Sequence, residues 1–230
     1  MRIAIFSDVH GNARALEAVL DEVRARGPFD RVINAGDLVF GGPRPRETMA
    51  LLLERGYPAV VGNTDEWVAG IAGGPGAVVE WTRRHLLPEH LALLRGLPRA
   101  RRVEPPGGPP LVVVHATPES TTESVMPDAP AGTLVRMLEQ AQARALAYGH
   151  VHRAYVREVE GGLVVNAGSV GFPFDGDPRP AWAIATLSGG RWSAEVVRVA
   201  YDREAVARDL LESDHPDAAA WARRVRTGTA

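Results

Sequence analysis

The feature that most constrains the fold is a repeated pattern in residues 1–61, where short apolar runs alternate with segments of helical periodicity. The runs 3–7, 31–34 and 59–61 are typical of short buried strands. Apolar residues at helical spacing between them predict one helix over 13–26 and a second through Met49 and Leu53. The order strand, helix, strand predicts a parallel α/β sheet.

The rest of the chain changes from helical to strand-rich. Three short helices are expected at 66–71, 77–86 and 88–94, and another at 133–142 after a polar loop. The expected later strands are 101–104, 111–114, 145–148, 154–159, 163–166, 182–187 and 192–199, the last two pairs forming hairpins. The stretch from Asp202 is expected to be helical, with an Ala-rich end that frays.

No linker or internal repeat interrupts the sequence. We therefore expect one domain over residues 1–230. Its two sheet-rich halves are expected to pack face to face with helices outside. The predicted fold class is α/β, a four-layer α/β/β/α sandwich.

Composition limits the chemistry. All 26 basic residues are Arg and there is no Cys, so neither a Schiff-base lysine nor a thiolate metal ligand is available. A net charge of −2 gives no general drive toward nucleic acid or anionic membranes. No run approaches the apolar length of a membrane span, and the first apolar run is too short for a signal peptide. A cytoplasmic location is expected.

Potential metal donors follow five of the predicted strands. They are Asp8 and His10, Asp37, Asn63, His115, and His150 with His152. Because ligands of open α/β sheets gather at the carboxyl ends of strands, these side chains are expected to converge. Each alone has an ordinary explanation, such as a helix cap for Asp8 or a core histidine for His115. The whole set predicts a metal site.

The ordered set Asp8-x-His10, Gly36-Asp37, Gly62-Asn63, His115 and Gly149-His150-x-His152 resembles the calcineurin-like metallophosphoesterase family. The stretch 166–171 and the short chain are similar to the compact prokaryotic phosphodiesterase branch. The resemblance implies the four-layer sandwich and two divalent metal ions. It implies that Asp8, His10 and His152 hold one ion, that Asn63, His115 and His150 hold the other, and that Asp37 bridges them.

The activity that the resemblance implies is hydrolysis of a small-molecule phosphate ester, with a diester as the expected substrate. A hydroxide shared by the two ions is expected to attack phosphorus in line, with Asp37, Asn63 and His10 central to catalysis. Manganese is expected first, while Fe, Zn, Co and Ni also suit nitrogen and oxygen donors.

One position departs from the family pattern. Thr64 stands where many relatives have a His that is assigned to leaving-group protonation or transition-state contact. Because a Thr hydroxyl is a poor acid near neutral pH, this departure argues against vigorous hydrolysis of poorly activated monoesters.

Other functions remain open at this stage. A phosphomonoesterase acting on nucleotides or proteins would use the same metal ligands. A non-catalytic scaffold of the same fold would tend to lose ligands, whereas all seven are intact here. A dinucleotide-binding oxidoreductase is disfavoured because the first strand turn lacks Gly-x-Gly-x-x-Gly. Long nucleic acid is an unlikely partner for so weakly acidic a chain.

Several residues near these motifs have no fixed role. Arg14 and Arg153 are candidate phosphate contacts, although exposure is the simpler expectation. Phe172 and Phe174 are expected to cover sheet edges, with stacking on a base or aryl group as the alternative. Three histidines in helical or tail segments are expected to be solvated: His85, His90 and His215.

Overall fold

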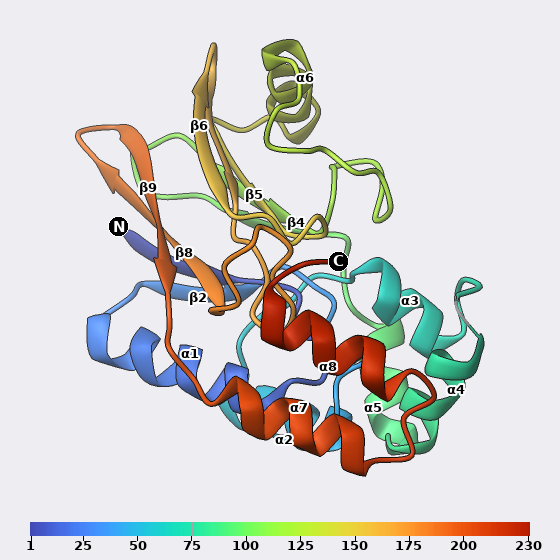
Figure 1. The fold of residues 1–230 in the computed structure, drawn as a ribbon. Helices are drawn as coiled ribbons and strands as arrows, with labels where there is room; N and C mark the ends of the chain where they lie inside the picture. Colours follow the sequence, from blue (N-terminus) through green and yellow to red (C-terminus); the bar gives the residue numbers. More distant parts are fainter. Residues whose placement is uncertain (75) are drawn as a thin grey trace.

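The protein is described here by a computed structural model covering residues 1–74 and 76–230 (Figure 1). Two β-sheets stack on each other. The first has the order β2 (Arg31–Asn34), β1 (Arg2–Phe6), β8 (Ala181–Ser188), β9 (Arg191–Arg198). The second has the order β3 (Ala100–Val103), β4 (Leu111–Val114), β5 (Ala145–Tyr148), β7 (Gly162–Asn166), β6 (Tyr155–Val159). Both sheets are mixed, because the predicted parallel pairs are joined by the antiparallel strands β3, β6, β8 and β9.

Strand alternation divides the core into layers. Ile3 and Ile5 of β1 face the second sheet, where they share one apolar cluster with Val113 and Ala147. Ala4 and Phe6, on the opposite face of β1, pack against α1 (Ala13–Arg26). On the far side, α6 (Ala131–Ala141) covers the outer face of the second sheet. The expected α/β/β/α layering is therefore confirmed.

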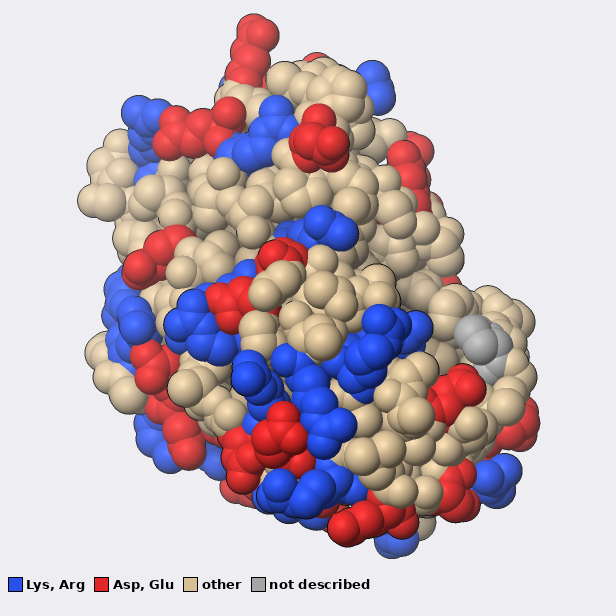
Figure 2. Space-filling view, viewed as in Figure 1, with Lys and Arg blue, Asp and Glu red and all other residues tan. Residues whose placement is uncertain are grey.

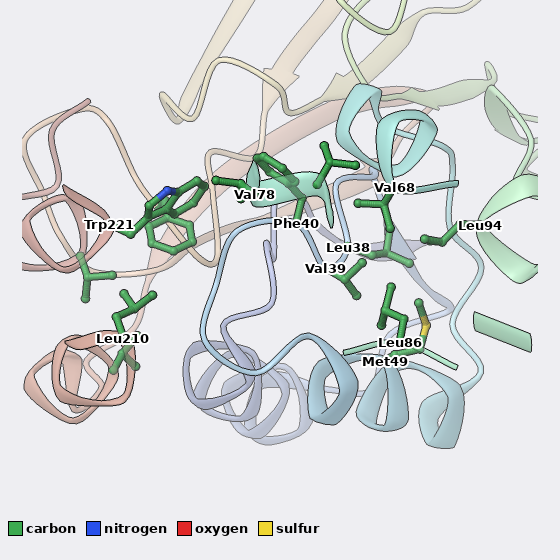
Figure 3. Close-up of a cluster of buried hydrophobic side chains, with 14 of the residues drawn as sticks. Leu38, Val39, Phe40, Met49, Val68, Val78, Leu86, Leu94, Leu210 and Trp221 are labelled. Carbon is green, nitrogen blue, oxygen red and sulfur yellow. The ribbon is translucent and has the colours of Figure 1, made fainter. Parts of the chain in front are cut away.

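The remaining helices gather at one end of the sandwich (Figure 1). They are α2 (Pro45–Arg55), α3 (Asn63–Ala69), α4 (Gly76–Arg84), α5 (Pro88–Arg95), α7 (Arg203–Glu212) and α8 (Ala218–Thr227). Figure 3 shows the apolar cluster that they share, in which Met49 and Leu94 lie at one side and Trp221 at the other. Within the described ranges, no helix is both long and apolar enough to cross a membrane.

Two expectations about this end of the molecule are wrong. Residues 59–61 do not form a strand, because only Ala59 makes an isolated bridge to Asn34 and the N–H of Val61 bonds to Pro98 instead. The segment after Asp202 does not end in a frayed helix. It forms two helices that pack together, and Trp221 of the second is 8% exposed.

Candidate metal centre

The structure brings all seven predicted ligands to one edge of the two sheets. Each follows the carboxyl end of a strand or begins a helix: Asp8 and His10 after β1, Asp37 after β2, Asn63 at the start of α3, His115 after β4, and His150 and His152 after β5. Six of these side chains are buried and His150 is half-buried. Strand ends that are far apart in sequence therefore deliver nitrogen and oxygen donors to one place.

The first group of donors is Asp8, His10 and His152. His152 Nε2 lies 3.1 Å from Asp8 Oδ1 and 3.0 Å from His10 Nε2. One ligand atom from each of the three residues lies within 4.8 Å of the others. This is the compact, buried N, N, O arrangement that suits a divalent cation.

The second group is Asn63, His115 and His150. Asn63 Oδ1 lies 3.0 Å from His115 Nε2 and 3.0 Å from His150 Nδ1. Asp37 Oδ2 lies between the two groups, at 3.6 Å from His10 Nε2 and 3.5 Å from His115 Nε2. Among the described residues, Asp37 is thus the one carboxylate within 4.0 Å of an imidazole nitrogen in each group.

Backbone carbonyls fix which imidazole nitrogen faces the cluster. His10 Nδ1 lies 3.0 Å from Phe40 O, His115 Nδ1 2.8 Å from Ala35 O, and His152 Nδ1 2.5 Å from Phe172 O. Because a carbonyl only accepts, each of these Nδ1 atoms carries a proton, and Nε2 is the ring nitrogen that faces the other donors. His150 is reversed: its Nε2 lies 3.1 Å from Thr122 O, which leaves Nδ1 free toward Asn63. One ring nitrogen of each of the four histidines therefore faces the cluster, so the donors fit divalent cations.

The backbone is strained where the ligands lie. Six non-glycine residues in the described part of the chain have positive φ, and five are predicted ligands. They are Asp8 (54°), His10 (51°), Asp37 (57°), His150 (66°) and His152 (54°). A left-handed backbone costs a side-chain-bearing residue about 1–2 kcal/mol. Such strain concentrated at one cluster indicates that the placement of these side chains is functional.

Two residues beside the cluster have roles that the sequence analysis missed or left open. The carboxylate of Asp65, which is fully buried, accepts backbone N–H groups of Asp37, Leu38 and Gly62 at 2.9 Å each. It thereby ties the Asp37 turn to the start of α3. Its place three residues after Gly62, the N-cap of α3, is the sequence signal for that role, because a carboxylate there can accept the N-cap N–H. Thr64 donates its N–H to Asp37 Oδ1 at 3.0 Å, and its hydroxyl is buried without a partner.

The charges of the cluster call for a cation. Burial lowers the pKa of His10 to about 4, so this imidazole is neutral near pH 7. Burial disfavours the charged Asp8, but the neighbouring imidazoles of His152, His115 and His10 together outweigh it and hold the pKa of Asp8 below its ordinary range. Burial and the charge of Asp37 raise the pKa of Asp65 to about 7. Burial favours neutral imidazoles, but Asp37 outweighs it at His115 and Asp8 outweighs it at His152, so the pKa of each ring is raised. A divalent cation would take the place of these protons as the positive charge beside the buried carboxylates.

A cavity of about 390 Å³ opens onto the cluster. Its lining includes the proposed ligands His10, Asp37, Asn63, His150 and His152, with Thr64, Phe40, Val78, Phe172, Phe174, Asp217, Trp221, Arg224 and Ala230.

The expectation that Phe172 and Phe174 cover sheet edges is wrong. Phe174 stacks on His152 with ring centroids 4.5 Å apart, and Phe172 is fully buried beside His10.

The expectation of solvated histidines is also wrong for two of the three. His90 and His215 are 6% and 5% exposed, while His85 is half-buried. The Nδ1 of His90 accepts the N–H of Leu87 at the start of α5. His215 packs against Trp81 and Trp221, so it helps to seat α8. None of these three rings belongs to the donor cluster.

Comparison with known proteins agrees with this geometry. The sequence model of the calcineurin-like phosphoesterase superfamily domain matches residues 1–190. The chain belongs to this superfamily. The match extends past the stretch to about residue 175 on which the resemblance rested, and it supports a metal-dependent phosphoesterase with a divalent metal at the buried Asp/His cluster.

Three proteins resemble the chain over all or nearly all of its length. A metallophosphoesterase from Sphaerobacter thermophilus is 28% identical, with a TM-score of 0.79 over 100% of this chain and 99% of that one. Protein PH1004 from Pyrococcus horikoshii is 19% identical with a TM-score of 0.86 over 100% and 99%, a likeness of fold alone. The uncharacterized protein MJ0912 of Methanocaldococcus jannaschii is 28% identical over 238 residues, 94% of each chain.

Metal binding is expected to raise the thermal stability. A cation that binds only the folded cluster raises the free energy of unfolding by about 2.7 kcal/mol when its concentration is 100 times its Kd. For a chain of this size, that corresponds to a rise in Tm of about 5–10 °C. The measurement is thermal unfolding of chelator-treated protein with and without Mn²⁺. His152→Ala should lose most of the rise and His85→Ala should keep it. A Tm that no divalent metal changes would contradict the assignment.

Proposed function

We propose that the protein is a phosphodiesterase that uses two divalent cations, manganese being the first expectation. Asp8, His10 and His152 would hold one cation, and Asn63, His115 and His150 the other. The observation that carries the proposal is the position of Asp37, whose Oδ2 lies 3.6 Å and 3.5 Å from imidazole nitrogens of the two groups. One carboxylate oxygen in that position suits a bridge between paired cations.

When bound, such cations neutralise phosphoryl oxygens and lower the pKa of water. The residues of the chain prepare the site for that chemistry. Backbone carbonyls bind Nδ1 of three imidazoles and so turn Nε2 toward the cluster, and no ring rotation is needed before a cation binds. Asp65 holds the Asp37 turn. Thr64 lines the cavity, and its buried hydroxyl has no hydrogen-bond partner within the protein.

Two features favour a diester over a monoester. Every imidazole that lines the cavity belongs to the proposed ligand set, and Thr64 replaces the His of many relatives, so the described lining offers no spare imidazole to protonate a poor leaving group. The cavity also extends from the ligands along Phe172, Phe174 and Val78. This apolar wall gives room for a second organic substituent on phosphorus, and an aryl group or base suits it.

The test compares a diester with a monoester that share one leaving group. With Mn²⁺ bound, we expect kcat/KM for bis(p-nitrophenyl) phosphate to exceed that for p-nitrophenyl phosphate by about tenfold or more. A kcat/KM of the order of 10⁴ M⁻¹s⁻¹ for the diester would lie in the ordinary range for enzymes. The variant Thr64→His should instead speed hydrolysis of phenyl phosphate more than that of p-nitrophenyl phosphate, because a general acid protonates a basic leaving group and is worth about 10²-fold or more there.

The alternatives predict different results. Faster hydrolysis of the monoester by the unaltered protein would identify a phosphomonoesterase. Absence of hydrolysis of either ester, with bound metal verified on the same sample, would favour a non-catalytic scaffold.

A further inference from the structure

Helix α8 forms one wall of the cavity. Trp221 packs edge-on against Phe172 and Phe40, with ring centroids 4.7 Å and 5.8 Å apart. Figure 3 shows Trp221 pointing toward Val78 and Phe40. At Gly41 a Cβ would lie 2.1 Å from the Trp221 ring, so only glycine lets the indole sit there. The position of α8 is therefore fixed against the loop that follows Asp37.

Arg224 lies one helical turn after Trp221 and lines the same cavity as Asp37 and His152. Its guanidinium carbon lies 5.0 Å from the Trp221 ring centroid, at cation–π distance. Its Nε is buried and has no hydrogen-bond partner. In the described part of the chain, no carboxylate lies within 4.0 Å of this guanidinium, Asp217 at the cavity rim included.

The other arginines near the site are differently placed. Arg14 is paired with Asp209 at 2.9 Å, and neither Arg14 nor Arg153 lines the cavity. Figure 2 shows basic side chains over α7 and α8 with acidic ones beside them. On α8 itself, Arg226 is paired with Glu204, and Arg223 is exposed. Arg224 is thus the arginine that lines this cavity. Its buried Nε–H lacks a hydrogen-bond acceptor, which buried N–H groups almost always have.

We propose that Arg224 contacts the phosphoryl oxygens of the substrate, with Trp221 holding the guanidinium in place. This inference rests on the proposed phosphoesterase function and adds a substrate-binding residue to it. A planar guanidinium with several N–H donors matches two phosphate oxygens at once. A phosphate ester beside the metal ligands would supply the acceptor that Arg224 lacks within the protein.

The chemical role of Arg224 would differ from that of the family's His at position 64. A guanidinium remains charged in proteins, so it stabilises negative charge on phosphorus-bound oxygens without donating a proton to the leaving group. The loss on its removal should therefore be about the same for leaving groups of low and high basicity. Removal of an acid catalyst would instead lower the rate most for substrates with basic leaving groups.

The first experiment measures diester hydrolysis by metal-loaded variants. We expect Arg224→Ala to lower kcat/KM by about 10²-fold, as for removal of one preorganised donor from a site of developing charge. Arg224→Lys should recover part of the loss, and guanidinium ion added to Arg224→Ala should restore activity in proportion to its concentration. The matched control is Arg223→Ala on the exposed face of α8, which should keep full activity.

Metal content and Tm separate this role from a structural one. Metal content should stay unchanged in Arg224→Ala, because its guanidinium contacts no proposed ligand, and Tm should fall only by the few degrees that loss of the Trp221 contact costs. Wild-type kcat/KM in Arg224→Ala, or a loss that guanidinium does not rescue, would overturn the inference while leaving the phosphoesterase proposal intact.

A binding measurement tests Arg224 without turnover. Calorimetric titration of the metal-loaded protein with inorganic phosphate should give a Kd about tenfold or more weaker in Arg224→Ala than in Arg223→Ala. Equal affinities would overturn the inference. If the unaltered protein hydrolyses no phosphate ester but Arg224→Ala alone loses phosphate affinity, the proposed function fails and the anion contact stands.

Discussion

The variant Asp37→Asn is expected to lower kcat/KM for a phosphodiester by about a thousandfold or more. Asn keeps the size of the side chain and an oxygen that can accept the Thr64 N–H, now 3.0 Å from Asp37 Oδ1. It removes the negative charge that lies between the two donor groups. Loss of paired-cation stabilisation is worth several kcal/mol, and each 1.4 kcal/mol is about tenfold in rate.

The measurement combines steady-state kinetics with metal analysis on the same sample. Fewer than two bound metal ions per chain are expected in Asp37→Asn. The matched control is Asp128→Asn, an exposed carboxylate in the polar loop before α6, which should leave kinetics and metal content unchanged. Wild-type turnover with full metal content in Asp37→Asn would refute the bridging role of Asp37.

The ligand cluster was predictable because its signals are local. In Asp8-Val9-His10 and His150-Val151-His152, donors two residues apart follow apolar strands, and strand ends meet at one edge of a sheet. The structure places these residues together, although their assignment as ligands of two metals, like the single domain, stays a prediction. The positive φ of His10 and His152 was not predictable, since neither residue type requires it.

The α8 wall was not predictable, because it depends on contacts between distant residues. The Ala-rich sequence around Trp221 has weak local signals, and its burial follows from packing on Phe40 and Phe172. Arg224 is one of 26 basic residues in the sequence, and nothing local distinguishes it from Arg223. For residues 59–61 the local signal was present but misleading. Their apolar sequence predicts a strand, but Val61 donates its N–H to Pro98 O, so pairing with β2 ends after one bridge.

The variant Gly62→Ala is expected to abolish metal binding and activity by a steric route. Gly62 has φ −100°, which any residue adopts, so a new side chain brings no backbone strain. Its Cβ would lie 2.0 Å from Asp37 Oδ1 and 2.5 Å from Asp37 N. The carboxylate or the turn must move. A displacement of about 1 Å in a catalytic group costs about 10²-fold in rate. The loss is expected to be larger in Gly62→Ala, because Asp37 lies between the two donor groups and both would lose its carboxylate.

Two other glycines separate this steric effect from the general cost of adding a methyl group. Gly56, at φ +61°, ends α2 and has open space around it, so Gly56→Ala should lose about 1–2 kcal/mol of stability through strain but keep full activity. Gly73 has neither a positive φ nor a neighbour within 4 Å, so Gly73→Ala should change nothing. Denaturant unfolding, metal analysis and diester kinetics on the three variants give the comparison. If Gly62→Ala binds metal and turns over like Gly73→Ala, then the contact between Gly62 and Asp37 does not position the cluster, and the Asp65 hydrogen bonds that join the same two turns must suffice.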